Sequence, residues 1–268
     1  MISCRPMYHF NVIGDPSMSA KRHGLPSLLF SLACAAIALF GSVGATSSVA
    51  QTFSITGDFS ATKNPNGVWT YGWLAAPGGV LHSYNTETSL TSGSGIDFWY
   101  DSTHVSDLDP SLWFNPSTTN YALTSTTTFF AGWAGFHPGL SGEYTDYRFT
   151  APAAGTYNLA LRFEGEESGG GGTTTHVLVL TNGTTLFSSG VNGFGAASLV
   201  TYTGSATLAA GQTLDIALTC GAKCQFDSTG IQGTITDAVP EPRAWLTMAG
   251  GIVILLFFYR RRASATVA

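Results

Sequence analysis

His176-Val-Leu-Val-Leu-Thr-Asn-Gly-Thr-Thr-Leu-Phe187 is the stretch that decides the fold. Its two halves are rich in β-branched and apolar residues, which favour strands. Asn182-Gly183 between them is the strongest short signal for a hairpin, because both residues readily adopt the positive φ of a two-residue turn. The sequence therefore predicts two antiparallel strands joined at residues 182–183.

The segment before this hairpin alternates between apolar and polar residues. Tyr157, Leu159, Leu161 and Phe163 are each separated by one residue of another kind. Successive side chains of a strand point to opposite faces, so this pattern predicts a strand with one buried face. Further strands are predicted at Phe53–Phe59, Val68–Trp73, Ile96–Tyr100, Thr126–Trp133, Tyr144–Thr150, Ser198–Leu208, Thr213–Thr219 and Thr229–Ile235.

Residues 51–236 therefore have the organisation of one all-β domain. Short strands recur between Gly, Pro, Asn and Ser, and no helical period persists beyond a turn or two. We expect a jelly-roll-like two-sheet sandwich, flanked by an N-terminal signal helix and a C-terminal single transmembrane helix. A Greek-key sandwich with another strand order is the alternative, and the sequence leaves both topologies open.

Residues 1–50 have the composition of a leader. The basic pair Lys21-Arg22 precedes an apolar stretch at residues 28–40, and small residues lead to Ser48-Val49-Ala50. This order is typical of a secretory signal peptide that is cleaved before Gln51.

The first residues of the chain fit this leader poorly. Residues 1–17 contain prolines and an aspartate and lack a basic cluster, so we expect translation to start at Met18. A retained membrane helix and a lipid anchor at Cys34 are the alternatives.

Residues 237–268 contain three further parts in order. Val239-Pro240-Glu241-Pro242 can continue neither a strand nor a helix because of its prolines. Residues 244–259 are uncharged and would span about 24 Å as a transmembrane helix. Arg260-Arg261-Arg262 follows, and the positive-inside rule places such a cluster in the cytoplasm.

This order of motif, short apolar helix and arginine cluster resembles the PEP-CTERM sorting signal of exported proteins of Gram-negative bacteria. The resemblance covers residues 239–262. It implies export through the Sec translocon, an inner-membrane intermediate and cleavage by a membrane-embedded exosortase. It also implies a final place at the cell surface or in the extracellular matrix, in association with exopolysaccharide. An ordinary C-terminal anchor with a Pro-Glu-Pro linker is the alternative.

The charge of the domain limits its partners. Residues 51–236 contain 4 basic and 13 acidic residues, a net charge of −9. Nucleic-acid binding requires a basic footprint, so this class of partner is not expected. Acidic surfaces favour cations, including calcium.

Residues 144–235 resemble a recurring module of secreted bacterial proteins that looks like a carbohydrate-binding β-sandwich. The matching blocks are Arg148–Tyr157, Gly169–Thr175, Val191–Gly195, Leu208–Asp215 and Asp227–Gly230. The resemblance implies a β-sandwich and glycan binding.

Two cysteines remain once the leader is removed. Cys220 and Cys224 stand four positions apart, and such a pair in an oxidising compartment predicts a local disulfide that stiffens a turn. A redox or metal role for the pair is the alternative.

Aromatic residues are the candidates for glycan contact. Trp69, Tyr71 and Trp73 share one face of a predicted strand, and we expect that face to be core rather than an exposed glycan platform. Trp113 and Phe114 lie between two prolines, which predicts a loop, and they are the candidate glycan-binding residues.

Acidic residues form two candidate cation sites. Asp101, Asp107 and Asp109 lie in a predicted loop with serines and are candidate calcium ligands, although a solvated loop is the simpler interpretation. Glu164, Glu166 and Glu167 before a glycine run are a second such group.

Catalysis has little support in the sequence, so no catalytic residues are assigned. His137, Glu143 and Arg148 could form an acid–base or metal group, but a turn with satisfied polar side chains is favoured. Nucleophile-elbow, zinc-helix and phosphate-loop motifs are missing from the sequence. We expect a non-enzymatic surface protein with a structural or weak glycan-binding sandwich. A calcium-assisted lectin-like protein and a secreted glycoside hydrolase are the alternatives.

Overall fold

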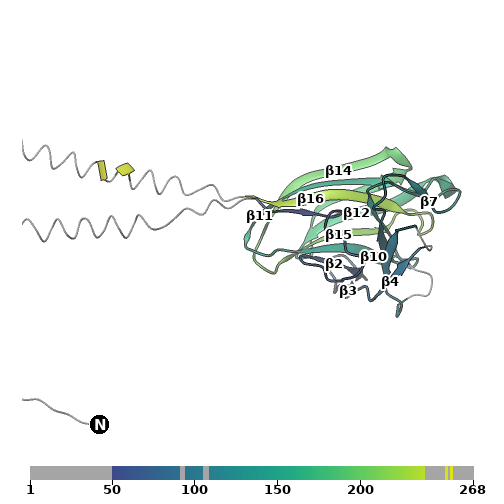
Figure 1. Ribbon diagram of the computed structural model, residues 1–268, viewed down its shortest axis with the longest axis horizontal. Coiled ribbons are helices and arrows are strands. Elements are labelled where there is room, and N and C mark those ends of the chain that lie inside the picture. Colours follow the sequence, from purple (N-terminus) through teal and green to yellow (C-terminus); the bar gives the residue numbers. More distant parts are fainter. Residues whose placement is uncertain (1–49, 91–93, 105–108, 239–250, 253, 256–268) are drawn as a thin grey trace, which may run out of the picture. The chain divides into compact units, whose positions relative to one another are not determined.

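The computed structural model describes residues 50–90, 94–104, 109–238, 251–252 and 254–255. The described residues between 50 and 238 form two antiparallel sheets that pack face to face, which confirms the prediction of an all-β two-sheet sandwich (Figure 1). The signal helix, the sorting motif, the arginine cluster and most of the predicted transmembrane helix lie outside the described residues. Within the described part of the chain, no helix has the length and apolar character needed to cross a membrane.

The first sheet has eight strands and contains both the first and the last strand of the domain. Its order is β14 (Gly195–Leu208), β11 (Gly155–Gly165), β16 (Thr229–Asp237), β9 (Ala134–His137), β6 (Ser111–Phe114), β5 (Asp97–Tyr100) and β4 (Thr86–Ser89). The eighth strand, β1 (Thr52–Ser54), pairs with the last residues of β16. The first and last strands of the domain therefore lie side by side.

The second sheet has six strands and covers the inner face of the first. Its order is β13 (Thr184–Gly193), β12 (Thr173–Thr181), β15 (Thr213–Cys220), β10 (Tyr144–Thr150), β2 (Trp69–Leu74) and β3 (His82–Ser83). A two-stranded ribbon, β7 (Tyr121–Ala122) with β8 (Thr128–Phe129), and a short 3-10 helix, η1 (Gly169–Gly171), complete the fold.

The predicted hairpin is confirmed. Thr181 pairs with Thr184 across the turn, and Asn182 and Gly183 have φ values of 49° and 76°. Positive φ at both turn residues is the geometry that matches the twist of a two-residue hairpin. The local sequence therefore fixes the register at this end of β12 and β13.

The core between the sheets is rich in aromatic side chains. Trp69, Tyr71 and Trp73 all face inward and are buried, which confirms the prediction that this trio is core. The ring of Tyr71 lies 5.6 Å from that of Tyr147 in an edge-to-face arrangement, a favourable geometry for aromatic pairs. Burial of these large apolar side chains is the main stabilising contribution to the sandwich.

The outer faces of both sheets are also partly covered. Phe98 and Trp113 point away from the inter-sheet core and pack with Phe129 in a second apolar cluster.

On the other sheet, residues 75–81 end in Leu81, which packs on the outward side chains of Leu74, Leu178, Leu180 and Ala217. We name residues 75–81 the flap. Gly78 of the flap contacts the hairpin turn at Gly183, and a Cβ added at Gly78 would lie only 2.6 Å from the Cα of Gly183.

The second cluster corrects one prediction. Trp113 and Phe114 lie in strand β6 and not in a loop; Trp113 is 1 % exposed and Phe114 is half-buried against the main core. The expected exposure of Trp113 is wrong because residues beyond β6 fold back and bury its ring. Gly135 makes this close packing possible, since a Cβ there would lie 2.4 Å from the indole.

The sandwich has two distinct ends. At one end, which we call the proximal end, β1 starts and β16 finishes, and Gln51 and Asp237 bond to one another. At the opposite, distal end, β16 starts at Thr229, next to Phe136 of β9. Both connections to the rest of the chain therefore leave from the proximal end.

Candidate functional site

A pocket at the distal end brings together residues from seven separate stretches of the chain. Its volume is about 280 Å³, and we call it the distal pocket. It is lined by Leu90, Phe98, Asp109, Ser111, Trp113, Leu123, Thr127, Phe129, His137, Glu167, Phe226 and Ser228. Four residues that the sequence singled out for different reasons, Asp109, Trp113, His137 and Glu167, therefore share one site.

The apolar part of the pocket is the second aromatic cluster. The ring of Trp113 lies 5.2 Å from that of Phe98 and 4.6 Å from that of Phe129. All three side chains are buried, so they form a rigid apolar floor rather than an open platform. Strands β5 and β6 hold the first two rings as direct cross-strand partners.

The polar wall begins with an aspartate–histidine pair. His137 Nδ1 lies 3.3 Å from Asp109 Oδ1 and 2.7 Å from the carbonyl oxygen of Pro138. The backbone N–H of Asp227 donates to His137 Nε2 at 3.4 Å. An accepting Nε2 places the ring proton on Nδ1, where it can be donated to the two oxygens. Ser111 Oγ also donates to Asp109, at 3.3 Å.

The wall continues with Glu167, which follows β11. Its Oε2 accepts a hydrogen bond from Thr127 Oγ1 at 2.7 Å, and its Oε1 accepts one from the backbone N–H of Gly169 at 3.3 Å. Glu166 beside it points into the protein. Burial raises the pKa of Glu166 well above its ordinary range, against the opposing effect of the hydrogen bond that the Phe130 backbone donates to its Oε1 at 2.9 Å.

An exposed aromatic ring forms part of the rim. Phe226 is 46 % exposed and has a φ of 59°, a backbone conformation that bulky residues rarely adopt. The disulfide between Cys220 and Cys224, the pairing expected from the sequence, lies just before it. Lys223 lies 5.4 Å over the ring and donates to the carbonyl of Gly170. The loop therefore holds Phe226 in a fixed position above the pocket.

Two further residues lie at or beside the rim: Asp227, which bonds to Thr174, and Leu123. Burial raises the pKa of Asp227, while hydrogen bonds from the backbone and hydroxyl of Thr174 lower it by less. Leu123 is a second partly exposed apolar residue of the rim.

The expected calcium loop is not assembled as a ligand set in the described structure. Asp101 Oδ1 accepts from Asn85 Nδ2 at 2.8 Å and from the Thr103 backbone at 3.0 Å, and Oδ2 accepts from Trp73 Nε1 at 3.1 Å. Asp109 faces His137, and Asp107 lies outside the described residues. Among the residues that the structure describes, no group of three or more His, Cys, Asp or Glu is arranged to hold a metal ion.

The other sequence candidates are also separated. Glu143 pairs with His104 at 3.2 Å, and Arg148 pairs with Asp215, so neither joins His137 in one site. Glu164 pairs with Arg162 at 3.3 Å, Glu166 accepts from the Phe130 backbone, and Glu167 accepts from Thr127, so each of the three carboxyl groups has its own partner.

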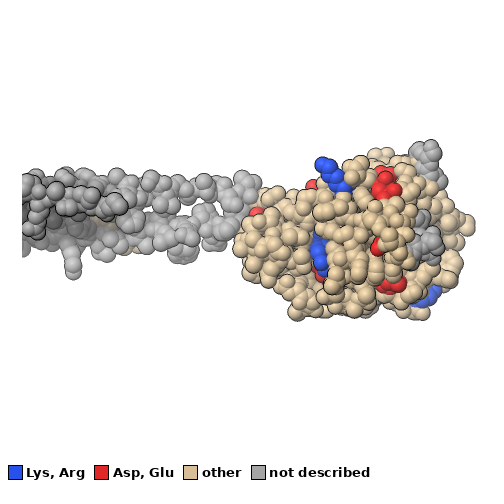
Figure 2. All heavy atoms as spheres, turned by 90° about the horizontal axis from the view of Figure 1, so that it is seen from below, with Lys and Arg blue, Asp and Glu red and all other residues tan. Residues whose placement is uncertain are grey.

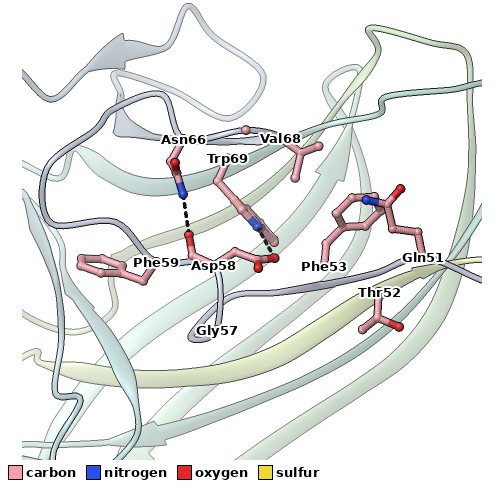
Figure 3. A pocket seen from close by; sticks show the side chains of 10 residues that line it. Gln51, Thr52, Phe53, Gly57, Asp58, Phe59, Asn66, Val68 and Trp69 are labelled. Carbon is pink, nitrogen blue, oxygen red and sulfur yellow. Dashed lines mark hydrogen bonds between the residues drawn. The ribbon is translucent and has the colours of Figure 1, made fainter.

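A second groove lies at the proximal end and has a volume of about 410 Å³ (Figure 3). Its polar groups are used by the fold itself. Asn66 Nδ2 donates to the carbonyl of Asp58 at 2.9 Å, and Trp69 Nε1 lies 3.4 Å from the Asp58 carboxylate, as the dashed lines show. The Ser54 backbone also donates to that carboxylate, at 2.8 Å. Polar groups of both cavities are bonded within the chain, so the exposed ring of Phe226 is what distinguishes the distal pocket and makes it the better candidate site.

Charged side chains are few on the face of the sandwich that Figure 2 shows. On the face that Figure 2 shows, the described basic side chains appear as isolated spots on a mostly uncharged surface. Recognition at such a surface depends on shape and hydrogen bonds more than on long-range electrostatics.

Sequence comparison finds no protein-family model and no curated protein that matches the chain. Solved structures that the chain matches include a native family 35 carbohydrate binding module from Clostridium thermocellum, with a TM-score of 0.30 and 16 % identity, covering 44 % of this chain and 87 % of that one. CBM51 from Clostridium perfringens GH95 in complex with methyl-galactose matches with a TM-score of 0.32 and 10 % identity, covering 57 % of this chain and 94 % of that one. An apo form cyclase from Fischerella sp. matches with a TM-score of 0.32 and 13 % identity, covering 65 % of this chain and 98 % of that one. At these TM-scores the similarities carry no argument about function.

Proposed function

We propose that this chain is an exported, non-enzymatic surface or matrix protein whose sandwich binds a glycan through the distal pocket. The observation that carries the proposal is the composition of that pocket: a rigid aromatic floor, a wall of hydrogen-bonding groups and an exposed ring at the rim. Sugar rings have apolar C–H faces and a periphery of hydroxyl groups, so a ligand of this class needs both kinds of surface. Binding sites in general combine apolar walls with a few placed polar groups.

The hydrogen-bonding groups suit a neutral polyhydroxylated ligand. Glu167 and Asp109 present carboxylate oxygens, which accept from hydroxyl groups, and Ser111 and Ser228 add side-chain hydroxyls. The volume of about 280 Å³ suits one or two sugar residues rather than a long chain segment.

A binding role is favoured over hydrolysis because the pocket carboxylates are held by their own chain. Glycosidases need one carboxyl group as acid and another as nucleophile or base across the scissile bond. Glu167 is held by Thr127 and Gly169, and Asp109 interacts with His137 and Ser111. These contacts orient acceptors for ligand hydroxyls and support recognition rather than turnover.

Replacing Phe226 by alanine is expected to weaken glycan binding about tenfold, the effect of losing an aromatic contact worth about 1.4 kcal/mol. The measurement is affinity for the tightest-binding member of a panel of neutral hexose, N-acetylhexosamine and uronic-acid oligosaccharides. Phe194→Ala is the matched control, because Phe194 is similarly exposed (40 %) but does not line the pocket.

Two results would contradict this proposal. Unchanged affinity in Phe226→Ala would place any binding elsewhere on the molecule. Absence of binding across the whole panel by the folded protein would instead favour a purely structural role in the matrix.

Export and processing are the second part of the proposal, and they rest on the sorting motif in the sequence. Replacing Glu241 by alanine is expected to block exosortase cleavage, so that the protein remains in the membrane fraction. Fractionation and mass spectrometry of cells producing each variant measure this, with Glu87→Ala in β4 as the control. Normal release of Glu241→Ala would overturn the sorting interpretation and favour an ordinary anchor.

A further inference from the structure

The strands that begin and end the sandwich meet at a pair of residues with no assigned role. Thr52 of β1 pairs with Thr236 of β16. One residue beyond this pair, the backbone N–H of Asp237 donates to the carbonyl of Gln51 at 3.0 Å, and the Gln51 nitrogen donates to Asp237 Oδ1. The Asp237 side chain therefore faces the nitrogen of the residue that follows the predicted leader.

The carboxylate of Asp237 is positioned to accept from the Gln51 nitrogen and has no cationic partner among the described residues. Among the described residues, none of the ion pairs involves its carboxylate. Its position is fixed because β16 pairs with β11 as far as Asp237, opposite Tyr157. Ala238 then bonds to the carbonyl of Thr156 at 2.7 Å, which anchors the chain just before the sorting motif.

We propose that Asp237 binds the α-amino group of the mature protein, which leader removal creates at Gln51. The inference rests on the export part of the proposed function, because only cleavage after Ala50 converts the Gln51 amide into an ammonium group. Charge-assisted hydrogen bonds are stronger than neutral ones, so cleavage strengthens the contact between β1 and β16. The α-amino group is mostly protonated at neutral pH, since its ordinary pKa is about 7.7–8.0.

This ion pair has a chemical consequence for the N-terminal glutamine. A terminal glutamine cyclises when its neutral α-amine attacks its own side-chain Cδ. The N–Cδ bond forms, the bond from Cδ to the amide nitrogen breaks, and ammonia leaves, so the product is an uncharged lactam. Asp237 stabilises the protonated amine and holds it in the β1–β16 pairing, which slows this reaction. The site therefore preserves a charged N-terminus beside Asp237, which precedes the sorting motif in the sequence.

The test is N-terminal mass spectrometry of the exported full-length protein and of its Asp237→Asn, Asp237→Glu and Asp97→Asn variants. We expect the mature chain to begin at Gln51, with cyclisation about two- to fivefold faster in Asp237→Asn, the factor that corresponds to an exposed ion pair. Asp237→Glu keeps the charge and should slow cyclisation relative to Asp237→Asn. Asp97→Asn, a carboxylate bonded to Ser89 at 2.8 Å in another part of the sheet, should behave as the parent protein.

Each other outcome has a definite meaning. Cleavage after Ala50 with equal or slower cyclisation in Asp237→Asn would overturn this inference and leave the export proposal intact. An uncleaved leader, or a mature N-terminus elsewhere, would overturn both.

Discussion

Replacing Arg148 by methionine is expected to lower the free energy of unfolding of the sandwich by about 3–5 kcal/mol. Arg148 Nε donates to Asp215 Oδ1 at 2.6 Å, and its Nη2 donates to Asp215 Oδ2 at 3.1 Å. The same Nε lies 3.9 Å from the carboxylate of Asp146. Without the guanidinium, two neighbouring carboxyl groups would remain buried on the outer face of β10 and β15 with no cation beside them.

The strength of this effect comes from burial. Asp146 and Asp215 are both nearly inaccessible, and breaking a buried ion pair leaves an uncompensated charge. Burial alone would lower the pKa of Arg148, but the hydrogen bonds to Asp215 and the charge of that carboxylate raise it above its ordinary value, so the arginine stays charged.

Chemical denaturation of residues 50–238 at neutral pH measures the loss. Arg162→Met is the matched control, because Arg162 is half exposed and its pair with Glu164 at 3.3 Å lies near the surface. That control is expected to lose at most about 1 kcal/mol. Equal losses in the two variants would show that the buried pair contributes no more than an exposed one.

Replacing Asp146 by asparagine is expected to stabilise the sandwich at neutral pH. Burial raises the pKa of Asp146 well above its ordinary value, and the neighbouring Asp215 raises it further, while Arg148 opposes the shift. The folded state therefore holds a proton that the unfolded state releases. The contribution of this proton to the free energy of unfolding is fully present at pH values below the pKa of Asp146 in the unfolded chain. It falls by about 1.4 kcal/mol per pH unit as the pH rises towards the pKa of Asp146 in the folded protein.

The isosteric amide removes this dependence because it cannot ionise. Denaturation midpoints between pH 4 and pH 8 should fall less steeply with pH in Asp146→Asn than in the parent, and some slope should remain because burial also raises the pKa of Glu166. Asp101→Asn is the control, because the stability contributed by Asp101 changes with pH in the opposite direction. Burial alone would raise the pKa of Asp101, but hydrogen bonds from Thr103 and Trp73 lower it. The stabilisation that the Asp101 carboxylate provides is therefore present at neutral pH and lost on acidification. Identical pH profiles in Asp146→Asn and the parent would contradict the account.

The features that the sequence predicted correctly depend on local rules. The turn at Asn182-Gly183 and the alternation of β11 each follow from the chemistry of neighbouring residues. The inward face of Trp69, Tyr71 and Trp73 follows from strand parity in the same way. Such patterns need no knowledge of what lies across the molecule.

The prediction for Trp113 failed because its environment is not local. Trp113 and its neighbour Leu112 point to opposite faces of β6, but both faces of this strand are covered by other parts of the chain. The ring is buried by Phe129, sixteen positions later, and by close packing on Gly135. Prolines on either side of the pair indicated a loop, whereas the intervening residues pair with β5 and β9.

The distal pocket could not be assembled from the sequence for the same reason. Asp109, His137, Glu167 and Phe226 are far apart in the chain and meet only through the pairing of β6, β9, β11 and β16. The close cysteine pair before Phe226 indicates a stiff loop without indicating what the loop presents.

The central claim is that the distal pocket holds a sugar, and amide chemical-shift mapping on addition of the best-binding panel glycan tests it most directly. The account predicts saturable changes at His137, Glu167, Phe226 and Ser228, with the proximal groove around Asp58 and Trp69 unchanged. Saturable changes confined to the proximal groove or to an open sheet face, with the distal amides unmoved, would contradict it.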